Sequence, residues 1–365
     1  MAYTFFPKTE DEICKKIKTA KQVGDITNLF YFLRNKFPAV ETPININLET
    51  LGKVNVSRSL EGSVDLATIK REIGLSKIII RFGSGSSGNR GVNNRGNLFE
   101  PQFAYAFLDW WTATKEPEQK MLNVCRELRD EYDLCAYNTL RWEAEGALNK
   151  KRPVVFSPNI IISAPGVIPG GDIGSIVTDL SLYGTKTEPN SREQFIAYFS
   201  LKLGTTATFF NVGIKTVLTT KEIQEGSIKN HEGLKLLNML GIDNLKFCKI
   251  FNGRSFTNLE SKKDDVWSAV DKGALETFLS SGIGHGYHII HKLSNEIKSI
   301  KVDKNYMKEA STPTSCVVYY GGMGGNGKRI DIEIKTSHYK FKLNIRDTQG
   351  QGGYPTRLMG DFSYV

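Results

Sequence analysis

Two segments near the middle of the chain place an acid and a lysine where they can meet. The first segment, Gly174–Gly184, contains Asp179, and the second, Phe195–Gly204, contains Lys202. The turn between them is polar and includes a proline and an asparagine, which predicts a β-hairpin. Residues opposite each other on paired strands have Cβ atoms about 5 Å apart. A carboxylate and an ammonium this close can hold a divalent metal ion beside a catalytic cation, as cleavage of phosphodiester bonds requires.

Such cleavage needs a metal ion that neutralises charge on the phosphate and acidifies a water molecule. Mg²⁺ prefers hard oxygen ligands and keeps several waters, so one or two carboxylates suffice. We expect Asp179 to supply a carboxylate, Leu201 a backbone carbonyl oxygen and Lys202 the ammonium. Because side chains alternate along a strand, Ser200 and Lys202 should share one face while the Leu201 side chain enters the core.

The segments around the hairpin are expected to build an α/β scaffold that positions these residues. A helix over 98–111 follows the glycine- and serine-rich loop 83–97 and carries Glu100 in its first turn. The other helices are predicted over 9–36, 64–74, 117–135, 137–149, 220–240 and 264–298. Further strands are predicted over 44–58, 77–82, 154–156, 159–162, 206–213, 316–321, 329–336 and 338–345.

The order of Asp179, a turn and then Ser-Leu-Lys at 200–202 resembles the PD-(D/E)xK nuclease superfamily, in a phage-type form. That superfamily often adds a glutamate on the first core helix, where this chain has Glu100. The resemblance implies a restriction-endonuclease-like core, a central mixed sheet flanked by helices, with helical and β elaborations at both ends. We therefore divide the chain into an N-terminal elaboration (1–74), a nuclease core (75–215) and a C-terminal α+β extension (216–365).

The resemblance also implies roles for the site residues and an activity, that of a Mg²⁺-dependent DNA endonuclease in which Mn²⁺ can substitute. Asp179 and Glu100 would bind the metal with the Leu201 carbonyl, and Lys202 would be the catalytic lysine. The chain departs from the family pattern at Ser200, where most members have Glu or Asp, and a hydroxyl is a poorer Mg²⁺ ligand than a carboxylate. Members with this replacement take an acid from elsewhere; Glu100 is the first candidate here, and Glu193 and Asp172 are the others. The alternative is a catalytically inactive DNA-binding protein or a phage virion protein that keeps the fold.

The charge of the chain favours a polyanionic partner. Lysine and arginine total 48 against 39 acidic residues, a net charge of +9, which suits nucleic acid or an anionic membrane surface. Arg90 and Arg95 in and beside the 83–97 loop are expected to grip DNA phosphates. Lys340, Lys342 and Arg346 share one face of a predicted strand and form a second DNA-binding face. An edge strand with charges that block aggregation explains the same pattern.

Two other patterns have simpler explanations than catalysis. Glu333 and Lys335 match the E-x-K spacing, but Asp331 precedes them on the same strand with no turn between, so alternation in a half-exposed strand accounts for the run. His288 and His291 would share a helix face and could bind zinc. No acid lies between them, and structural or solvent-exposed histidines are the preferred interpretation.

The chain shows no sign of export or of a membrane span. Its five cysteines contain no CxxC pair and are odd in number, which indicates reduced thiols in a cytosolic protein. No apolar run reaches 18 residues, and the first residues lack the apolar segment of a signal peptide. We expect a cytoplasmic protein (in the host cytoplasm if phage-encoded) with no membrane partner, and the sequence leaves a homodimer open.

Overall fold

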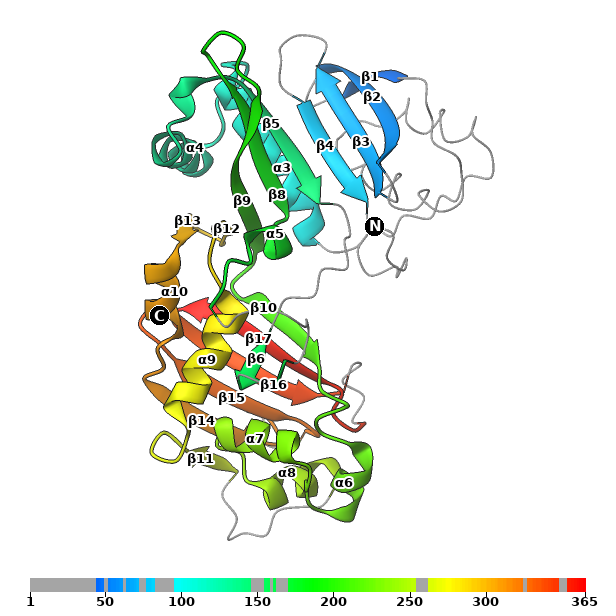
Figure 1. Cartoon of the computed structure of the whole chain (residues 1–365), viewed down its shortest axis with the longest axis vertical. Helices are drawn as coiled ribbons and strands as arrows, with labels where there is room; N and C mark the ends of the chain where they lie inside the picture. The colour runs from blue at the N-terminus through cyan, green and yellow to red at the C-terminus, as the bar shows by residue number, and fades with distance from the viewer. Residues whose placement is uncertain are drawn as a thin grey trace, which may run out of the picture. The chain divides into compact units, whose positions relative to one another are not determined.

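The computed structural model forms two compact units, each built around its own sheet (Figure 1). The first unit combines Met1–Lys150, Val177–Gly204 and Tyr287–Lys301, and the second combines Lys151–Ile176, Thr205–Gly286 and Val302–Val365. The residues that the structure describes are 44–48, 52–61, 64–71, 77–82, 95–145, 154–157, 160–161, 170–253, 262–323, 327–347 and 353–365.

The first unit contains a mixed sheet with the strand order β1-β2-β3-β4-β5-β8-β9-β12-β13. Its strands are β1 (Ile44–Leu48), β2 (Gly52–Glu61), β3 (Val64–Arg71), β4 (Lys77–Phe82), β5 (Tyr137–Glu145), β8 (Leu180–Lys186), β9 (Glu193–Leu203), β12 (Tyr287–Lys292) and β13 (Ile297–Val302). Strands β5, β8 and β9 pair antiparallel in succession, whereas β12 runs parallel to β9. A parallel pair needs a crossover connection, and here residues 205–286 of the second unit lie between the two strands in sequence. Strand β12 thus joins this sheet from beyond the segment 75–215 that we predicted as the core.

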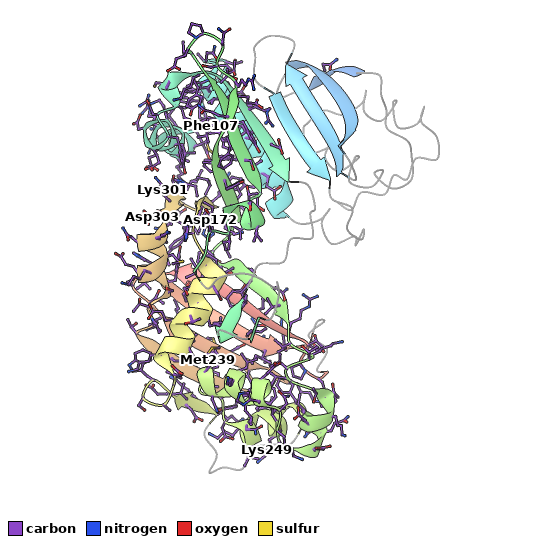
Figure 2. The ribbon with its side chains drawn as sticks, in the orientation of Figure 1. Phe107, Asp172, Met239, Lys249, Lys301 and Asp303 are labelled. Carbon is purple, nitrogen blue, oxygen red and sulfur yellow. The ribbon has the colours of Figure 1, made fainter. Side chains whose placement is uncertain are left out.

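Helix α3 (Arg95–Trp111) is held on this sheet by aromatic side chains. Phe99, Phe103 and Phe107 recur every four residues, which places them on one face of the helix, and all three are buried. The ring of Trp142 on β5 lies 5.7 Å from Phe103 and 5.4 Å from Phe107, the latter labelled in Figure 2, and 5.0 Å from Phe199 on β9. This cluster fixes the helix that carries Glu100 against the strand that carries Lys202. The described part of this unit also contains helix α4 (Gln119–Glu131) and the 3₁₀ turn η1 (Leu134–Ala136).

The second unit contains an antiparallel sheet with the order β10-β17-β16-β15-β14-β11 and a two-stranded sheet β6-β7. Helices flank the large sheet (Figure 1), and strands such as β14 bury alternate residues. Its strands are β6 (Val155–Ser157), β7 (Ile160–Ile161), β10 (Ala207–Gly213), β11 (Lys263–Asp265), β14 (Ser315–Tyr320), β15 (Ile330–Lys335), β16 (Tyr339–Arg346) and β17 (Arg357–Tyr364). Its helices are α6 (Thr220–Glu225), α7 (His231–Met239), α8 (Asn244–Phe251), α9 (Lys272–Ile283) and α10 (Lys304–Ser311), and α5 (Gly174–Val177) lies at the boundary of the units.

Each helix from α6 to α10 begins at a side chain that caps it. The capping oxygen accepts a hydrogen bond from a backbone N–H of the first turn, which satisfies a donor that has no partner within the helix. The capping residues are Thr219, Asn230, Asp243, Asp271 and Asp303. No helix in the described ranges is both long and apolar enough to cross a membrane.

The mixed α/β class, the helix over 98–111 and the strands near 77–82, 206–213, 316–321, 329–336 and 338–345 are confirmed. The helices predicted over 64–74 and 137–149 are wrong, because these segments form β3 and β5. The second segment has helix-forming residues, but pairing on both sides with β4 and β8 decides its conformation. The helix predicted over 9–36 lies outside the described residues.

The long helix predicted over 264–298 is also wrong. Only Lys272–Ile283 is helical there, and it ends where Gly284 and Gly286 adopt φ values of 57° and 86°. Glycine adopts positive φ without the cost that a side chain brings, so it stops a helix readily. The chain then enters β12, and His288 and His291 lie on a strand instead of a helix.

Candidate active site

Asp179 lies in the bend between α5 and β8, and β9 holds it in place. Its backbone N–H donates a 2.8 Å hydrogen bond to the carbonyl of Phe199. Its carboxylate oxygen Oδ2 accepts a 2.7 Å bond from the N–H of Leu201 and a 3.3 Å bond from the hydroxyl of Ser200. Bonds from N–H groups to a carboxylate are stronger than neutral ones, so two consecutive residues of β9 orient this acid. The first hairpin strand starts only at Leu180, later than predicted.

The carbonyl of Leu201 projects toward the same side as Asp179. The N–H and C=O of one residue in a strand point to the same edge, which is why paired residues can exchange both bonds. Because the Leu201 N–H reaches Asp179, its carbonyl oxygen faces the same region. The Leu201 side chain is buried and Ser200 is fully buried, while Lys202 is half-buried. Ser200 is therefore as buried as Leu201, and only Lys202 has the partial exposure expected for the face that the two polar residues were predicted to share.

Glu100 joins this group from α3. Its side chain is partly buried, and burial raises its pKa well above the usual range for a glutamate. The negative charge of Asp179 raises the pKa further, and the positive charge of Lys202 lowers it. Effects of this kind act between charges that are close together. The structure therefore brings Glu100, Asp179 and Lys202 to one place, although nearly eighty residues of sequence separate the two acids.

The donor set suits a hard divalent cation that keeps part of its water shell. Two carboxylates that repel each other, as the raised pKa of Glu100 reflects, gain from a cation between them. Within the described ranges no group of three or more histidine, cysteine or acidic residues could hold a metal ion. The groups at this place that could contact such an ion are the carboxylates of Glu100 and Asp179 and the carbonyl of Leu201. Mg²⁺ accepts such a partial set because waters complete its coordination, whereas a structural zinc site needs four nitrogen or sulfur ligands.

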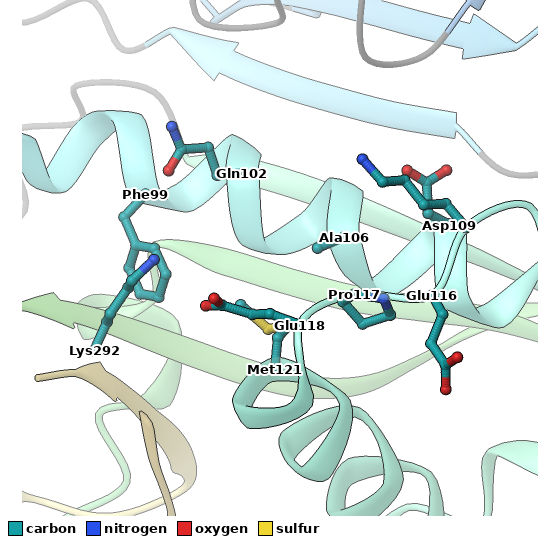
Figure 3. A pocket seen from close by; sticks show the side chains of 10 residues that line it. Phe99, Gln102, Ala106, Asp109, Glu116, Pro117, Glu118, Met121 and Lys292 are labelled. Carbon is teal, nitrogen blue, oxygen red and sulfur yellow. The ribbon is translucent and has the colours of Figure 1, made fainter. Parts of the chain in front are cut away.

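A cavity of about 250 Å³ adjoins α3 and the residues before α4, and Glu100 is not among its lining residues (Figure 3). Lys292, from the end of β12, lies beside the ring of Phe99 at 5.8 Å from its centre, and the carboxylate of Glu118 is directed toward them. Lys292 pairs with Leu203 in the sheet, one residue beyond Lys202. Its place here depends on the parallel pairing of β9 with β12, which the spacing of residues did not indicate. The cavity is lined by Phe99, Gln102, Ala106, Asp109, Lys115, Glu116, Pro117, Glu118, Met121 and Lys292.

The other acids considered for the site lie elsewhere. Glu193 begins β9, at the opposite end of the strand from Lys202, and forms an ion pair with Arg141 at 2.8 Å. Asp172 belongs to the second unit, where it accepts a bond from the Gly174 N–H. Glu193 is thus engaged by Arg141 and Asp172 by the Gly174 N–H, whereas the charge of Glu100 interacts with those of Asp179 and Lys202.

Of the arginines predicted to contact DNA beside α3, Arg90 lies outside the described residues. Arg95 is described only by its backbone, as the first residue of α3. The C-terminal basic residues Lys340, Lys342 and Arg346 do share one face of β16. Lys340 forms a 2.8 Å ion pair with Glu333, so acids of β15 offset part of that positive charge.

The two alternative patterns have structural explanations. Asp331 is buried and paired with Arg329, so the run 331–335 does not form a second acidic cluster with Lys335. His288 is buried between Tyr132 and Ser299, with hydrogen bonds of 3.0 and 2.8 Å, and burial lowers its pKa to about 3. His291 donates from Nε2 to the carbonyl of Gly204 at 2.7 Å. Both rings are buried and hydrogen-bonded, which agrees with a structural role and not with solvent-exposed histidines.

No family model matches the chain, and comparisons with curated proteins and with solved structures likewise give no match.

Proposed function

We propose that this chain is a Mg²⁺-dependent DNA endonuclease with a restriction-endonuclease-like core. The observation that carries the proposal is the convergence of Glu100, Asp179 and Lys202 at one end of the β8–β9 hairpin. The antiparallel strands β5, β8 and β9, with β12 parallel beside them and α3 packed on the sheet, suit the mixed sheet of that fold. The net charge of +9 suits a polyanionic substrate.

Glu100, Asp179 and the Leu201 carbonyl would hold the metal ion, which supplies charge neutralisation at the phosphate and a more acidic water. The chain itself fixes the geometry of these ligands. The Ser200 hydroxyl and the Leu201 N–H both donate to Oδ2 of Asp179 and so fix the orientation of its carboxylate. Neither of these two bonds involves Oδ1. The aromatic cluster around Trp142 holds α3, and with it Glu100.

Lys202 contributes a positive charge beside two carboxylates. In this position its ammonium orients the attacking water and stabilises the negative charge that grows on the phosphate during attack. Attack in line with the leaving group forms the new bond from water oxygen to phosphorus and breaks the P–O3′ bond. Preorganised charges of this kind act without reorganising at the moment of reaction.

A second function, DNA binding without cleavage, has one specific observation in its favour. Oδ2 of Asp179 already accepts two hydrogen bonds, and the buried Ser200 occupies the position where the family usually has an acid. This leaves fewer metal ligands than an active nuclease of the family would have. The second function predicts salt-sensitive DNA binding with no metal-dependent turnover.

The two functions separate in one experiment. Supercoiled plasmid is incubated with the wild type, with Lys202→Ala and with Lys186→Ala, each in Mg²⁺, Mn²⁺ or EDTA. Lys186 ends β8 far from Asp179 and serves as the matched control. We expect metal-dependent nicking or linearisation by the wild type and Lys186→Ala, and a loss of about 100-fold or more in Lys202→Ala.

Cleavage that survives Lys202→Ala would remove this lysine from the mechanism. An absence of cleavage with every metal, together with retained DNA binding, would leave the second function.

A further inference from the structure

The second unit contains a cavity of about 330 Å³ at the connection between β14 and β15. All residues of the candidate active site belong to the first unit, so this cavity is a separate feature. Two cationic side chains and a buried acid line it together with the backbone of a glycine-rich turn. The lining residues are Gly321, Gly322, Met323, Gly327, Arg329, Asp331 and Lys342.

Asp331 anchors the guanidinium of Arg329, and both of its carboxylate oxygens accept hydrogen bonds. Its Oδ1 accepts bonds from Nε at 2.9 Å and Nη2 at 2.5 Å of Arg329, and its Oδ2 accepts a 3.0 Å bond from the N–H of Met323. The Asp331 side chain is only 2% exposed, whereas that of Arg329 is 34% exposed. Nη1 of Arg329 makes no hydrogen bond to another described residue. The acid therefore holds the arginine through Nε and Nη2, and a third of the arginine side chain remains exposed.

Gly321, Gly322 and Gly327 pack closely against this arginine. Gly322 has a φ of 76°, and a Cβ there would meet Cδ of Arg329 at 2.8 Å and Cγ at 2.9 Å, so a larger residue would displace the side chain. The N–H of Gly321 donates to the carbonyl of Arg329 at 2.9 Å, and the N–H of Gly327 donates to the carbonyl of Gly321 at 2.8 Å. An arginine held in one conformation before binding loses less entropy when a ligand arrives.

Lys342, from β16, adds a second positive charge at the cavity. Its Nζ lies 3.8 Å from Oδ2 of Asp331, and its side chain is 40% exposed. The residues that line the cavity carry two positive charges and one negative, and the acids opposite Lys342 on the neighbouring strands, Glu333 and Asp361, are not among them. Arginine presents donors in a planar fork that matches a phosphate, and lysine binds phosphate as a point charge. The volume suits a phosphate group with part of a nucleotide.

We propose that this cavity binds a phosphate group, held by Arg329 and Lys342. Within the function proposed above, the group is a backbone phosphate of DNA outside the cleavage site; this assignment rests on that function, whereas the phosphate site itself does not. A free nucleotide offers the same chemistry, so the experiment must distinguish the two sources.

The experiment measures binding in EDTA, where no metal-dependent cleavage interferes. Calorimetric titrations use inorganic phosphate and deoxyadenosine monophosphate, and fluorescence anisotropy uses a labelled duplex of 20 base pairs. The variants are Lys342→Gln, Arg329→Lys and the control Lys335→Gln, an exposed lysine of β15 outside the cavity. Arg329→Lys keeps a charge beside the buried Asp331, and thermal melting checks its fold. If it does not fold, Lys342→Gln carries the test.

We expect Lys342→Gln and Arg329→Lys to weaken phosphate and nucleotide binding about tenfold or more, as for a lost hydrogen bond to a charged group. Lys335→Gln should match the wild type. For the duplex, Lys342→Gln should make the slope of log affinity against log salt less steep by about one. The variants could weaken nucleotide binding and leave the affinity for the duplex unchanged. That result would support the phosphate site and assign it to free nucleotides.

The proposal is overturned if the wild type binds neither phosphate nor nucleotide and if the variants bind the duplex as tightly as the wild type does. Equal weakening by Lys335→Gln would also overturn it, because the effect would then be one of general surface charge. Phosphate binding in a protein that fails to cleave plasmid would reject the nuclease function and leave this site standing.

Discussion

The backbone N–H of Leu201 donates a 2.7 Å hydrogen bond to the carboxylate of Asp179. This bond joins the acid at the start of β8 to the residue immediately before Lys202 on β9. The positions of the acid and the lysine are therefore linked through the backbone and do not depend on a direct contact between their side chains. Substitution of the Lys202 side chain should therefore change the charge of the site and leave the position of Asp179 unchanged.

Replacement of Ser200 by aspartate tests whether the site lacks a metal ligand. Ser200 is fully buried and its hydroxyl lies 3.3 Å from Asp179 Oδ2. A third carboxylate would repel the other two, so Ser200→Asp should melt below the wild type without metal. With Mg²⁺ the repulsion becomes attraction, and the rise in melting temperature on adding Mg²⁺ should exceed that of the wild type. Ser200→Ala, which only loses the hydroxyl, serves as the control. An equal rise in all three proteins would show that no metal binds next to residue 200.

The raised pKa of Glu100 predicts how stability changes with pH. In the folded protein Glu100 keeps its proton at a pH where the unfolded chain, with a glutamate pKa of about 4.3, has lost it. The folded state then binds more protons, so the free energy of unfolding falls as pH rises through this window. Glu100→Gln resembles the protonated form of Glu100, so its free energy of unfolding should not fall in this pH window. In the absence of metal, the variant should therefore be more stable than the wild type at neutral pH.

Urea denaturation at a series of pH values measures this difference. Glu116→Gln, an exposed acid before α4, controls for the loss of one negative charge. If the wild type and Glu100→Gln lose stability in parallel as pH rises, burial does not govern the protonation of Glu100.

The same pKa predicts that protons compete with Mg²⁺. A metal ion binds the ionised carboxylate, and burial together with Asp179 favours the protonated form of Glu100. The Mg²⁺ concentration that gives half-maximal plasmid cleavage should therefore fall as pH rises above the usual range for glutamate. Cleavage at saturating Mg²⁺ should depend less on pH than cleavage at low Mg²⁺. A half-maximal concentration that stays constant across pH would exclude Glu100 as a ligand.

The aromatic cluster beneath α3 predicts a large effect on stability. Phe103 is fully buried and its ring contacts Trp142 at 5.7 Å. Phe103→Ala should lower the free energy of unfolding by about 3–5 kcal/mol, the range for loss of a buried aromatic side chain. Phe195 on β9 is 44% exposed, and Phe195→Ala should cost less than about 1 kcal/mol. Similar losses for both substitutions, measured by urea denaturation, would mean that this cluster does not anchor the helix.

Local pattern was enough to find the candidate chemistry and several of the elements. The sequence pattern predicted the strand that carries Lys202, although not the burial of Ser200, and the apolar spacing after Leu98 predicted the helix that carries Glu100. These features depend on neighbours within a few residues, and periodicity in the sequence records them directly.

Tertiary structure alone decided which distant segments meet. It made 137–145 a central strand in spite of its helix-forming residues, brought 287–292 beside β9 with Lys292, and folded a glycine turn around Arg329. Strand pairing and the fixing of a buried ion pair depend on partners tens of residues away. Local propensity is worth less than about 1 kcal/mol per residue, so the hydrogen bonds and burial gained between those partners outweigh it.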